Sequence, residues 1–342
     1  MNKSISIPKT SCKRLEYVDV MRGIAISLVV VGHLLQFNGL ATDNSVFEFI
    51  YSFHMPLFFA ISGYITQKVT CIDSIDRLII YYKKKILSIA LPFFVWTIFV
   101  NNYVLREEWI VLEWQSVMHS LMNPGLWFLK TLFMILIAYG LGNFVYNKLC
   151  KKNKLYAFLL SSLFIAFIIL LIVCSGIEEK NLIMFSFFFM GGAAISLFPS
   201  IEKLCLSDIV CFLAYLCFAI LATHWKFDGA RLDDFYKIII STSCFVVLFN
   251  FCQKFIMFGR LSKMLQLFGR ESLSIYVMQF YLCKLTNIKI QEIDINPLIL
   301  FLVTFVVAIG ICFICSYVSL ALKKNTYLGL LLFGKRLSKQ TL

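Results

Sequence analysis

The sequence is poor in charged residues, and this scarcity excludes most water-soluble folds. Only 15% of its 342 residues are Asp, Glu, Lys or Arg, whereas 60% are hydrophobic and the mean hydropathy is +0.83. Soluble domains are about 25% charged and about 45–50% apolar. A single water-soluble core could not hide so much apolar surface. The composition therefore predicts an all-α integral membrane protein with several crossings.

Motifs for metals, redox chemistry and nucleic acids are also lacking. The 12 cysteines are scattered, mostly in apolar stretches where a thiol behaves as a small hydrophobe. No group of Cys and His has zinc-binding spacing. Cys312 and Cys315 form a C-x-x-C pair, but they lie in an apolar run without the context of a soluble redox motif. We therefore expect no metal and no nucleic-acid partner.

Long apolar runs, in contrast, are abundant. A helix needs about 20 predominantly apolar residues to cross about 30 Å of hydrocarbon. Ten segments meet or approach this length, at residues 21–37, 47–66, 86–105, 126–147, 156–173, 182–198, 205–223, 235–252, 272–285 and 297–322. We predict about ten transmembrane helices in one membrane domain at residues 21–322, between tails at residues 1–20 and 323–342.

The basic residues predict the orientation of these helices. With the N-terminus inside, 24 of the 32 Lys and Arg residues fall on inner segments, as the positive-inside rule requires. Both termini are then cytoplasmic, and the net charge of +13 needs no nucleic-acid explanation. No small-residue cleavage pattern follows the basic start, so we interpret residues 1–20 as a cytoplasmic tail rather than a signal peptide.

Polar side chains at membrane depth are costly and are therefore candidates for function. Arg22 stands at the entrance of the first predicted helix, and His33 follows eleven residues later, about 16 Å along the helix axis. His54 lies in the second predicted helix, at nearly the same depth as His33, within about 4 Å. Two imidazoles could share one cavity. Alternatively, each could bond a carbonyl or hydroxyl across a helix interface.

Three cations, Lys83, Lys84 and Lys85, precede the third predicted helix on the same inner side as Arg22. They are placed to hold an anionic, phosphate-bearing cofactor that arrives from the cytosol. They could equally be topology markers that contact phospholipid headgroups. The sequence alone leaves both interpretations open.

Several stretches, in this order along the chain, resemble acyltransferase family 3, the bacterial membrane O-acyltransferases of cell-surface sugars. "RGIAISLVVVGH" resembles the family's Arg-x10-His signature, and "FHMPLFFAISGYI" resembles its aromatic pair followed by Ser62 and Gly63. "LPFFVW", "GLWFLKTLFMIL" and "FGRESLSIYVMQFYL" fit the same pattern. The sequence departs from the family at the lysines before "LPFFVW", where arginines are common, and at Gln279, where a histidine is frequent.

The resemblance implies a reaction. Such enzymes take an acyl group from cytosolic acyl-CoA, most often acetyl-CoA, to a hydroxyl of a cell-surface or lipid-linked sugar, in the bacterial inner membrane. His33 would act as general base, since the ordinary pKa of imidazole, about 6.5, is close to working pH, or it would carry the acyl group itself. Arg22 would anchor the phosphates of coenzyme A, helped by Lys83, Lys84 and Lys85.

The remaining candidate substrate contacts are His54, Ser62, Trp127 and Tyr276. Ser62 and Tyr276 could donate hydrogen bonds to the oxyanion of the tetrahedral intermediate, and Trp127 could line the path of the acceptor. Small residues in membrane helices more commonly allow close packing, which is the alternative for Ser62 and Gly63.

Two other classes of function remain open. A proton-coupled transporter or exporter of a glycan or small solute would also bury histidines, but transporters often contain repeated halves. Residues 1–170 and 171–342 show no such repeat, and the polar residues concentrate in the first four predicted helices. A noncatalytic accessory subunit of a glycan machine is the third class, and the presence of both Arg22 and His33 argues against it. A homo-oligomer is compatible with the sequence.

Overall fold

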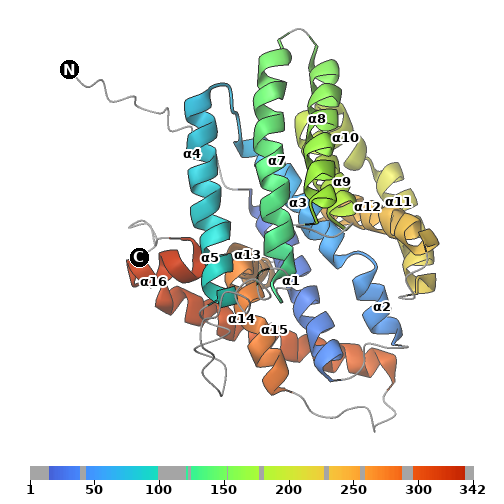
Figure 1. Cartoon of the computed structure of the whole chain (residues 1–342). Coiled ribbons are helices and arrows are strands. Elements are labelled where there is room, and N and C mark those ends of the chain that lie inside the picture. Colours follow the sequence, from blue (N-terminus) through green and yellow to red (C-terminus); the bar gives the residue numbers. More distant parts are fainter. Residues whose placement is uncertain are drawn as a thin grey trace.

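The computed structural model describes residues 15–38, 44–98, 121, 125–151, 153–176, 181–226, 231–254, 259–286 and 296–335. Every regular element within these ranges is a helix, and no strand occurs among them (Figure 1). The predicted all-α class is confirmed. An apolar chain in lipid can satisfy its backbone polar groups within a helix, which explains why these runs are helical.

Within the described ranges, six helical spans are long and apolar enough to cross a membrane. They are α1 (Glu16–Phe37), the pair α2 (Ser45–Tyr51) and α3 (His54–Val69), α7 (Trp127–Leu149), α8 (Lys154–Cys174), α12 (Arg231–Lys254) and α15 (Pro297–Leu322). The helices α9 (Asn181–Leu197) and α10 (Pro199–Cys205) meet at 104° and make a seventh span if they are counted together.

The described residues therefore give six or seven spans, where the sequence predicts ten. The helices α11 (Asp208–His224) and α14 (Ser272–Leu285) coincide with two predicted spans, but they have only 17 and 14 residues, fewer than the about 20 that a crossing needs. The third predicted span begins as the π-helical turn η1 (Ile86–Ala90) and α5 (Leu91–Phe94), and residues 99–105 lie outside the described ranges. The cytoplasmic location of the termini stays a prediction.

The helix α1 packs against α13 (Gly259–Arg270), α14 and α15. Glycines bring α1 and α13 together: a Cβ at Gly23 would lie 2.0 Å from the carbonyl oxygen of Leu265, and a Cβ at Gly269 would lie 1.8 Å from that of Asp19. Small residues permit this close approach of helix backbones. The contact fixes the rotation of α1 and so decides which of its side chains face the cavity described below.

The helices α3 and α9 meet in the same way. A Cβ at Gly63 would lie 1.8 Å from the carbonyl oxygen of Phe189, and a Cβ at Gly192 would lie 1.9 Å from that of Ala60. The packing interpretation of Gly63 is therefore confirmed, and the opposite face of α3 remains available to line a cavity.

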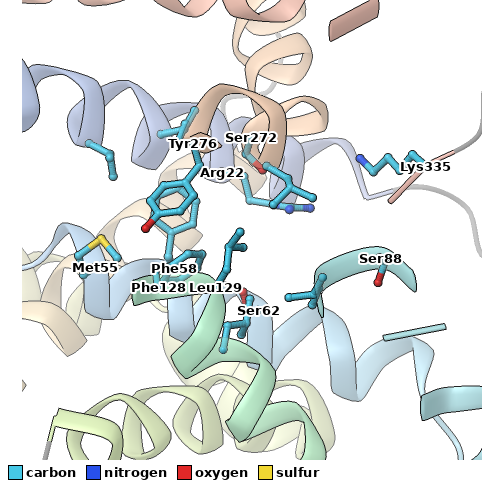
Figure 2. Close-up of a pocket in the computed structure, with 15 residues that line it drawn as sticks. Arg22, Met55, Phe58, Ser62, Ser88, Phe128, Leu129, Ser272, Tyr276 and Lys335 are labelled. Carbon is cyan, nitrogen blue, oxygen red and sulfur yellow. The ribbon is translucent and has the colours of Figure 1, made fainter. Parts of the chain in front are cut away.

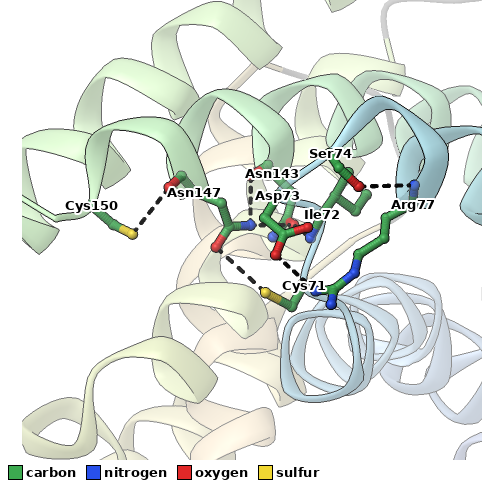
Figure 3. A network of polar contacts seen from close by, with 8 residues as sticks. All are labelled: Cys71, Ile72, Asp73, Ser74, Arg77, Asn143, Asn147 and Cys150. Carbon is green, nitrogen blue, oxygen red and sulfur yellow. Dashed lines mark hydrogen bonds and ion pairs between the residues drawn. The ribbon is translucent and has the colours of Figure 1, made fainter. Parts of the chain in front are cut away.

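The helix α4 (Ile75–Lys85) lies in a segment predicted as an inner loop, and polar contacts fix it to α7 (Figure 3). The side chain of Asn143 accepts the backbone N–H of Ile72 at 3.0 Å, just before α4 begins. The hydroxyls of Tyr81 and Tyr82 donate to backbone carbonyls of α7 at 3.1 and 2.9 Å. These bonds hold the start of η1 at a set position beside α7.

The turn η1 has a local cause in the sequence. The ring of Pro92 would clash with the carbonyl of Ser88, four residues earlier, if the helix were a regular α-helix. The wider π-helical turn relieves this conflict, and such turns are frequent at functional sites. Ser88 lies within it.

Part of the predicted C-terminal tail folds back as the helix α16 (Thr326–Phe333), at the red end of the chain in Figure 1. Asn325 caps its first turn by accepting two backbone N–H groups. Gly334 ends it in the left-handed conformation, with a φ of 62° that most other residues avoid. Capping at both ends accounts for a helix of only eight residues.

The end of α16 is tied to η1 and α5. Nε1 of Trp96 donates to the carbonyl of Leu332 at 2.8 Å. Gly334 packs so closely on η1 that a Cβ there would lie 2.5 Å from the Cα of Ser88. Lys335, the last described residue, is thereby held next to η1.

Candidate functional site

A cavity of about 220 Å³ lies between α1, α3, η1, α7 and α14, with Lys335 at its edge (Figure 2). Its lining includes two cations, Arg22 and Lys335, and three serines, Ser62, Ser88 and Ser272. It also includes an apolar and aromatic group: Met55, Phe58, Phe128 and Tyr276. In Figure 2, Arg22 and Lys335 lie on one side of the cavity and the aromatic group lies on the other. The cavity therefore suits a ligand with an anionic end and a less polar end.

The face of α1 that lines the cavity leads from Arg22 toward His33. Arg22, Ile26 and Val29 line the cavity at helical spacing. Eleven residues of α-helix turn through about three full turns, so His33 lies on the same face as Arg22, about 16 Å further along the axis. His33 is not among the lining residues, and it lies about one turn beyond Val29.

His33 has a buried partner on α14. Its Nδ1 lies 2.6 Å from Nε2 of Gln279, whose side chain is 1% exposed. The ring of Phe280 packs edge-on to the imidazole, with 6.3 Å between ring centroids. The imidazole is itself half-buried. Neighbouring residues of α14 thus hold the position of the ring.

His54 has different surroundings. It begins α3, after a break that separates α2 from α3, and it is buried. Its Nδ1 lies 2.8 Å from the carbonyl oxygen of Ile50, so Nδ1 donates, because a carbonyl only accepts. The ring of Tyr51 packs on the His54 ring at 4.6 Å. The cavity lining includes neither histidine, and the hydrogen bond of His54 is local, to a carbonyl four residues earlier in the chain.

The three predicted phosphate-binding lysines end α4, outside the cavity lining. Lys83 and Lys84 are exposed to solvent. Lys85 is half-buried, with its ammonium 5.3 Å from the centre of the Tyr81 ring. Burial, together with the positive charges of Lys84 and Arg22, lowers the pKa of Lys85 to about 8. Lys85 is therefore the lysine of the three whose charge is coupled to Arg22.

Of the three remaining candidate substrate contacts, two line the cavity and one does not. Ser62 and Tyr276 line the cavity, whereas Trp127 packs outside it, on Phe128 and Phe185 at 6.4 and 5.3 Å between ring centroids. The hydroxyl of Tyr276 is buried beside the backbone of Phe128, and its proton has no hydrogen-bond acceptor among the described residues. Leaving a buried donor without an acceptor costs about 1–3 kcal/mol. A group bound in the cavity is therefore the natural partner of this hydroxyl.

A buried ion pair fixes the start of α14, from which Ser272 and Tyr276 reach the cavity. The carboxylate of Glu271, just before the helix, accepts hydrogen bonds from Lys323 and from Ser319. Burial by itself would raise the pKa of Glu271, but the charge and hydrogen bond of Lys323 hold it below its ordinary value. Within the described residues, no group of three or more His, Cys, Asp or Glu is placed to hold a metal.

Comparison with known families decides the class of this protein. The family model described as "Acyltransferase domain" matches residues 15–317. The chain belongs to acyltransferase family 3. The match spans every helix that lines the cavity, and family membership supports a transferase over a transporter.

Two proteins named nodulation protein NolL match parts of the chain. The one from Mesorhizobium japonicum is 28% identical over 155 residues, which are 43% of this chain and 39% of that protein. The one from Sinorhizobium fredii is 54% identical over 54 residues, which are 14% of this chain and 15% of that protein. The chain thus matches well under half the length of either relative. No solved structure matches it.

The stretches that resemble acyltransferase family 3 converge on the cavity. The first supplies Arg22, the second supplies Phe58 and Ser62, the stretch at the start of α7 supplies Phe128, and the stretch in α14 supplies Tyr276. Four segments that are distant in sequence thus line one space.

Several residues of this site, among them Ser88, Lys335 and Gln279, were not predicted from the sequence. Ser88 and Lys335 line the cavity, and Gln279 contacts His33. The caps at Asn325 and Gly334 are sequence signals for α16, and they could have suggested that the segment before Lys335 is folded. Nothing in the sequence alone pairs Gln279 with His33.

Proposed function

We propose that this protein is a membrane O-acyltransferase of the bacterial inner membrane, which moves an acyl group, most simply acetyl, from cytosolic acyl-CoA to a hydroxyl of a cell-surface or lipid-linked sugar. One observation carries the proposal: a cavity that is cationic at Arg22 and aromatic at Tyr276, along a face of α1 that continues to His33. Membership in acyltransferase family 3 supports the reaction class.

The size of the cavity indicates which part of the donor it takes. Pockets for drug-sized ligands measure about 300–1,000 Å³, and this cavity, at about 220 Å³, is smaller. In our proposal it holds the acyl-bearing arm, while the nucleotide stays at the mouth. Arg22 and Lys335 then face the phosphates, and the exposed ends of Lys83 and Lys84 lie on the approach.

The hydroxyl of Tyr276 fits the carbonyl end of the arm. A donor aimed at the acyl oxygen stabilises the negative charge that develops there during attack, a contribution worth about 10²–10³-fold in rate for one donor. Ser62, on the facing helix α3, is the second hydroxyl in the proposed site.

His33 is the proposed general base. A sugar hydroxyl is a weak nucleophile, so its proton must leave as its oxygen attacks the thioester carbon. The proton passes to the imidazole, the C–S bond breaks, and the proton is returned to the departing thiolate of coenzyme A. His33 lies about one helical turn, about 5–6 Å, beyond Val29, which lines the cavity. In our proposal the cavity extends over this turn, so that the acyl carbon comes within reach of His33.

The test of this proposed function is transfer itself. Membrane vesicles that contain the full chain would receive acetyl-CoA labelled in the acetyl group, and the label would be followed into the glycan and lipid fractions. We expect label in a sugar ester that mild alkali releases, and none in vesicles without the protein. Arg22→Ala should need a higher acetyl-CoA concentration for the same rate. Label in protein alone, or in no fraction, would contradict the proposal.

A further inference from the structure

The contact between His33 and Gln279 determines more than the position of the imidazole ring. The two residues come from helices that pack together, α1 and α14. The amide of Gln279 is shielded from solvent and lies 2.6 Å from Nδ1 of His33. A partner on one ring nitrogen sets which nitrogen of a neutral imidazole carries the proton.

Which ring nitrogen of His33 can accept a proton depends on which end of the Gln279 amide faces the ring. In the structure, Nε2 of Gln279 faces Nδ1 and donates to it, so the proton of a neutral imidazole lies on its own Nε2. If Oε1 of Gln279 faces Nδ1 instead, the proton lies on Nδ1, and Nε2 has a free lone pair. The two ends of an amide have nearly the same shape, so a half-turn exchanges them without repacking.

Cys283 is placed to permit this half-turn. Its Sγ lies 3.4 Å from Oε1 of Gln279, one helical turn along α14. A thiol is both a weak donor and a weak acceptor, so it can face either end of the amide. A buried carboxylate or carbonyl in its place would favour one orientation only.

We infer that Gln279 is a positioning residue that sets the tautomer of His33: its carbonyl oxygen holds a proton on Nδ1 and leaves Nε2 as the base. This inference rests on the proposed function of His33. During attack, the acceptor's proton passes to Nε2 and gives an imidazolium, whose Nδ1–H stays bonded to Gln279. The proton on Nε2 then passes to the departing thiolate. Before this proton transfer begins, the Gln279 amide rotates by a half-turn, so that Oε1 faces Nδ1 of His33.

Two substitutions of Gln279 separate tautomer control from packing. Gln279→Leu keeps the approximate volume and removes both ends of the amide. Because general acid–base catalysis contributes about 10²–10⁴-fold, kcat for acetyl transfer should fall by up to that factor, with little change in the KM for acetyl-CoA. Gln279→Glu offers only acceptor oxygens and should restore much of kcat. Its carboxylate also stabilises the imidazolium, so the acidic limb of the pH–kcat profile should move to higher pH.

Gln67→Leu is a matched control. It removes another glutamine, which accepts a hydrogen bond from Tyr139 and does not contact His33. It should leave kcat and the pH profile at wild-type values. Nitrogen-15 NMR of the four histidines, with His33 assigned by its loss in His33→Ala, reports the tautomer directly. Gln279→Glu should place the proton of neutral His33 on Nδ1.

The outcomes separate this inference from the proposed function. If His33→Ala abolishes transfer but Gln279→Leu keeps the wild-type kcat and pH profile, the positioning role is overturned and the proposed function stands. If the wild type transfers nothing, both are overturned. If His33→Ala is fully active, the role of His33 and this inference are overturned, and the transfer reaction stands. A Gln279→Leu loss that Gln279→Glu does not reverse, with no shift of the pH profile, would indicate packing alone and would also overturn the inference.

Discussion

Arg22, near the start of the chain, and Lys335, close to its end, line the same cavity (Figure 2). Lys335 also donates to the backbone carbonyl of Arg270 at 2.9 Å, and an ammonium has three protons to donate. If both cations face the phosphates of the donor, Lys335→Gln should raise the KM for acetyl-CoA about three- to tenfold, with little change in kcat. Initial rates at varied acetyl-CoA give both constants.

The control for Lys335 is Lys324→Gln, which removes an exposed cation from the start of the same segment but outside the cavity. Its KM should equal that of the wild type. Equal KM values for Lys335→Gln and Lys324→Gln would contradict a role of Lys335 in donor binding.

The substitution Tyr276→Phe should lower activity without lowering stability. The proton of the hydroxyl has no hydrogen-bond acceptor among the described residues, so removal of the hydroxyl should change the thermal unfolding temperature little. If the hydroxyl stabilises the oxyanion, kcat should nevertheless fall about 10²- to 10³-fold. Thermal unfolding in detergent and the rate of coenzyme A release would be measured on one preparation. A fully active Tyr276→Phe enzyme would refute the assignment.

The charge of Lys85 predicts a pH dependence of donor binding. Burial, with the charges of Lys84 and Arg22, lowers its pKa to about 8. Below that pH the ammonium attracts an anionic donor, and above it the neutral amine does not. Affinity for acetyl-CoA should therefore fall as pH rises through about 8. Lys85→Arg keeps its charge at these pH values and should remove the fall. An identical pH dependence of binding in both proteins would exclude Lys85 as its source.

The approach of α3 to α9 depends on the absence of a side chain at Gly63. An added Cβ would lie 1.8 Å from a backbone oxygen of α9, so Gly63→Ala should separate the helices and destabilise the protein by about 1–3 kcal/mol or more. Gly310→Ala is the control, because a Cβ at that position of α15 meets nothing within 4 Å. Thermal unfolding should distinguish the two, and equal unfolding temperatures would contradict the close packing.

The sequence predicted the elements whose signal is local. Apolar runs located the long helices, and the spacing from Arg22 to His33 predicted their separation along α1. Of the ten predicted crossings, the described residues show six or seven. The predicted segment 272–285 coincides with α14, which is short for a crossing, whereas the 104° angle between α9 and α10 was not predicted. The α4 segment was also predicted as a loop, although an amphipathic helix with exposed lysines is compatible with the same residues.

The contacts between distant segments were beyond a single sequence. Lys335 reaches the cavity because Trp96 and the Gly334 turn hold α16 against η1, and these contacts depend on tertiary packing. The pairing of Gln279 with His33 likewise depends on how α14 is rotated against α1. For the lysines at the end of α4, the sequence showed the positive charge but could not show that Lys83 and Lys84 point to solvent.

The most direct measurement compares the wild type with His33→Ala, both purified in detergent, for binding of acetyl-CoA and for transfer of its acetyl group. Because His33 lies outside the cavity lining, we predict that the variant binds acetyl-CoA as tightly as the wild type while its release of coenzyme A falls to background. Wild-type release by His33→Ala would contradict the role of His33, and failure of both proteins to bind acetyl-CoA would contradict the proposed reaction.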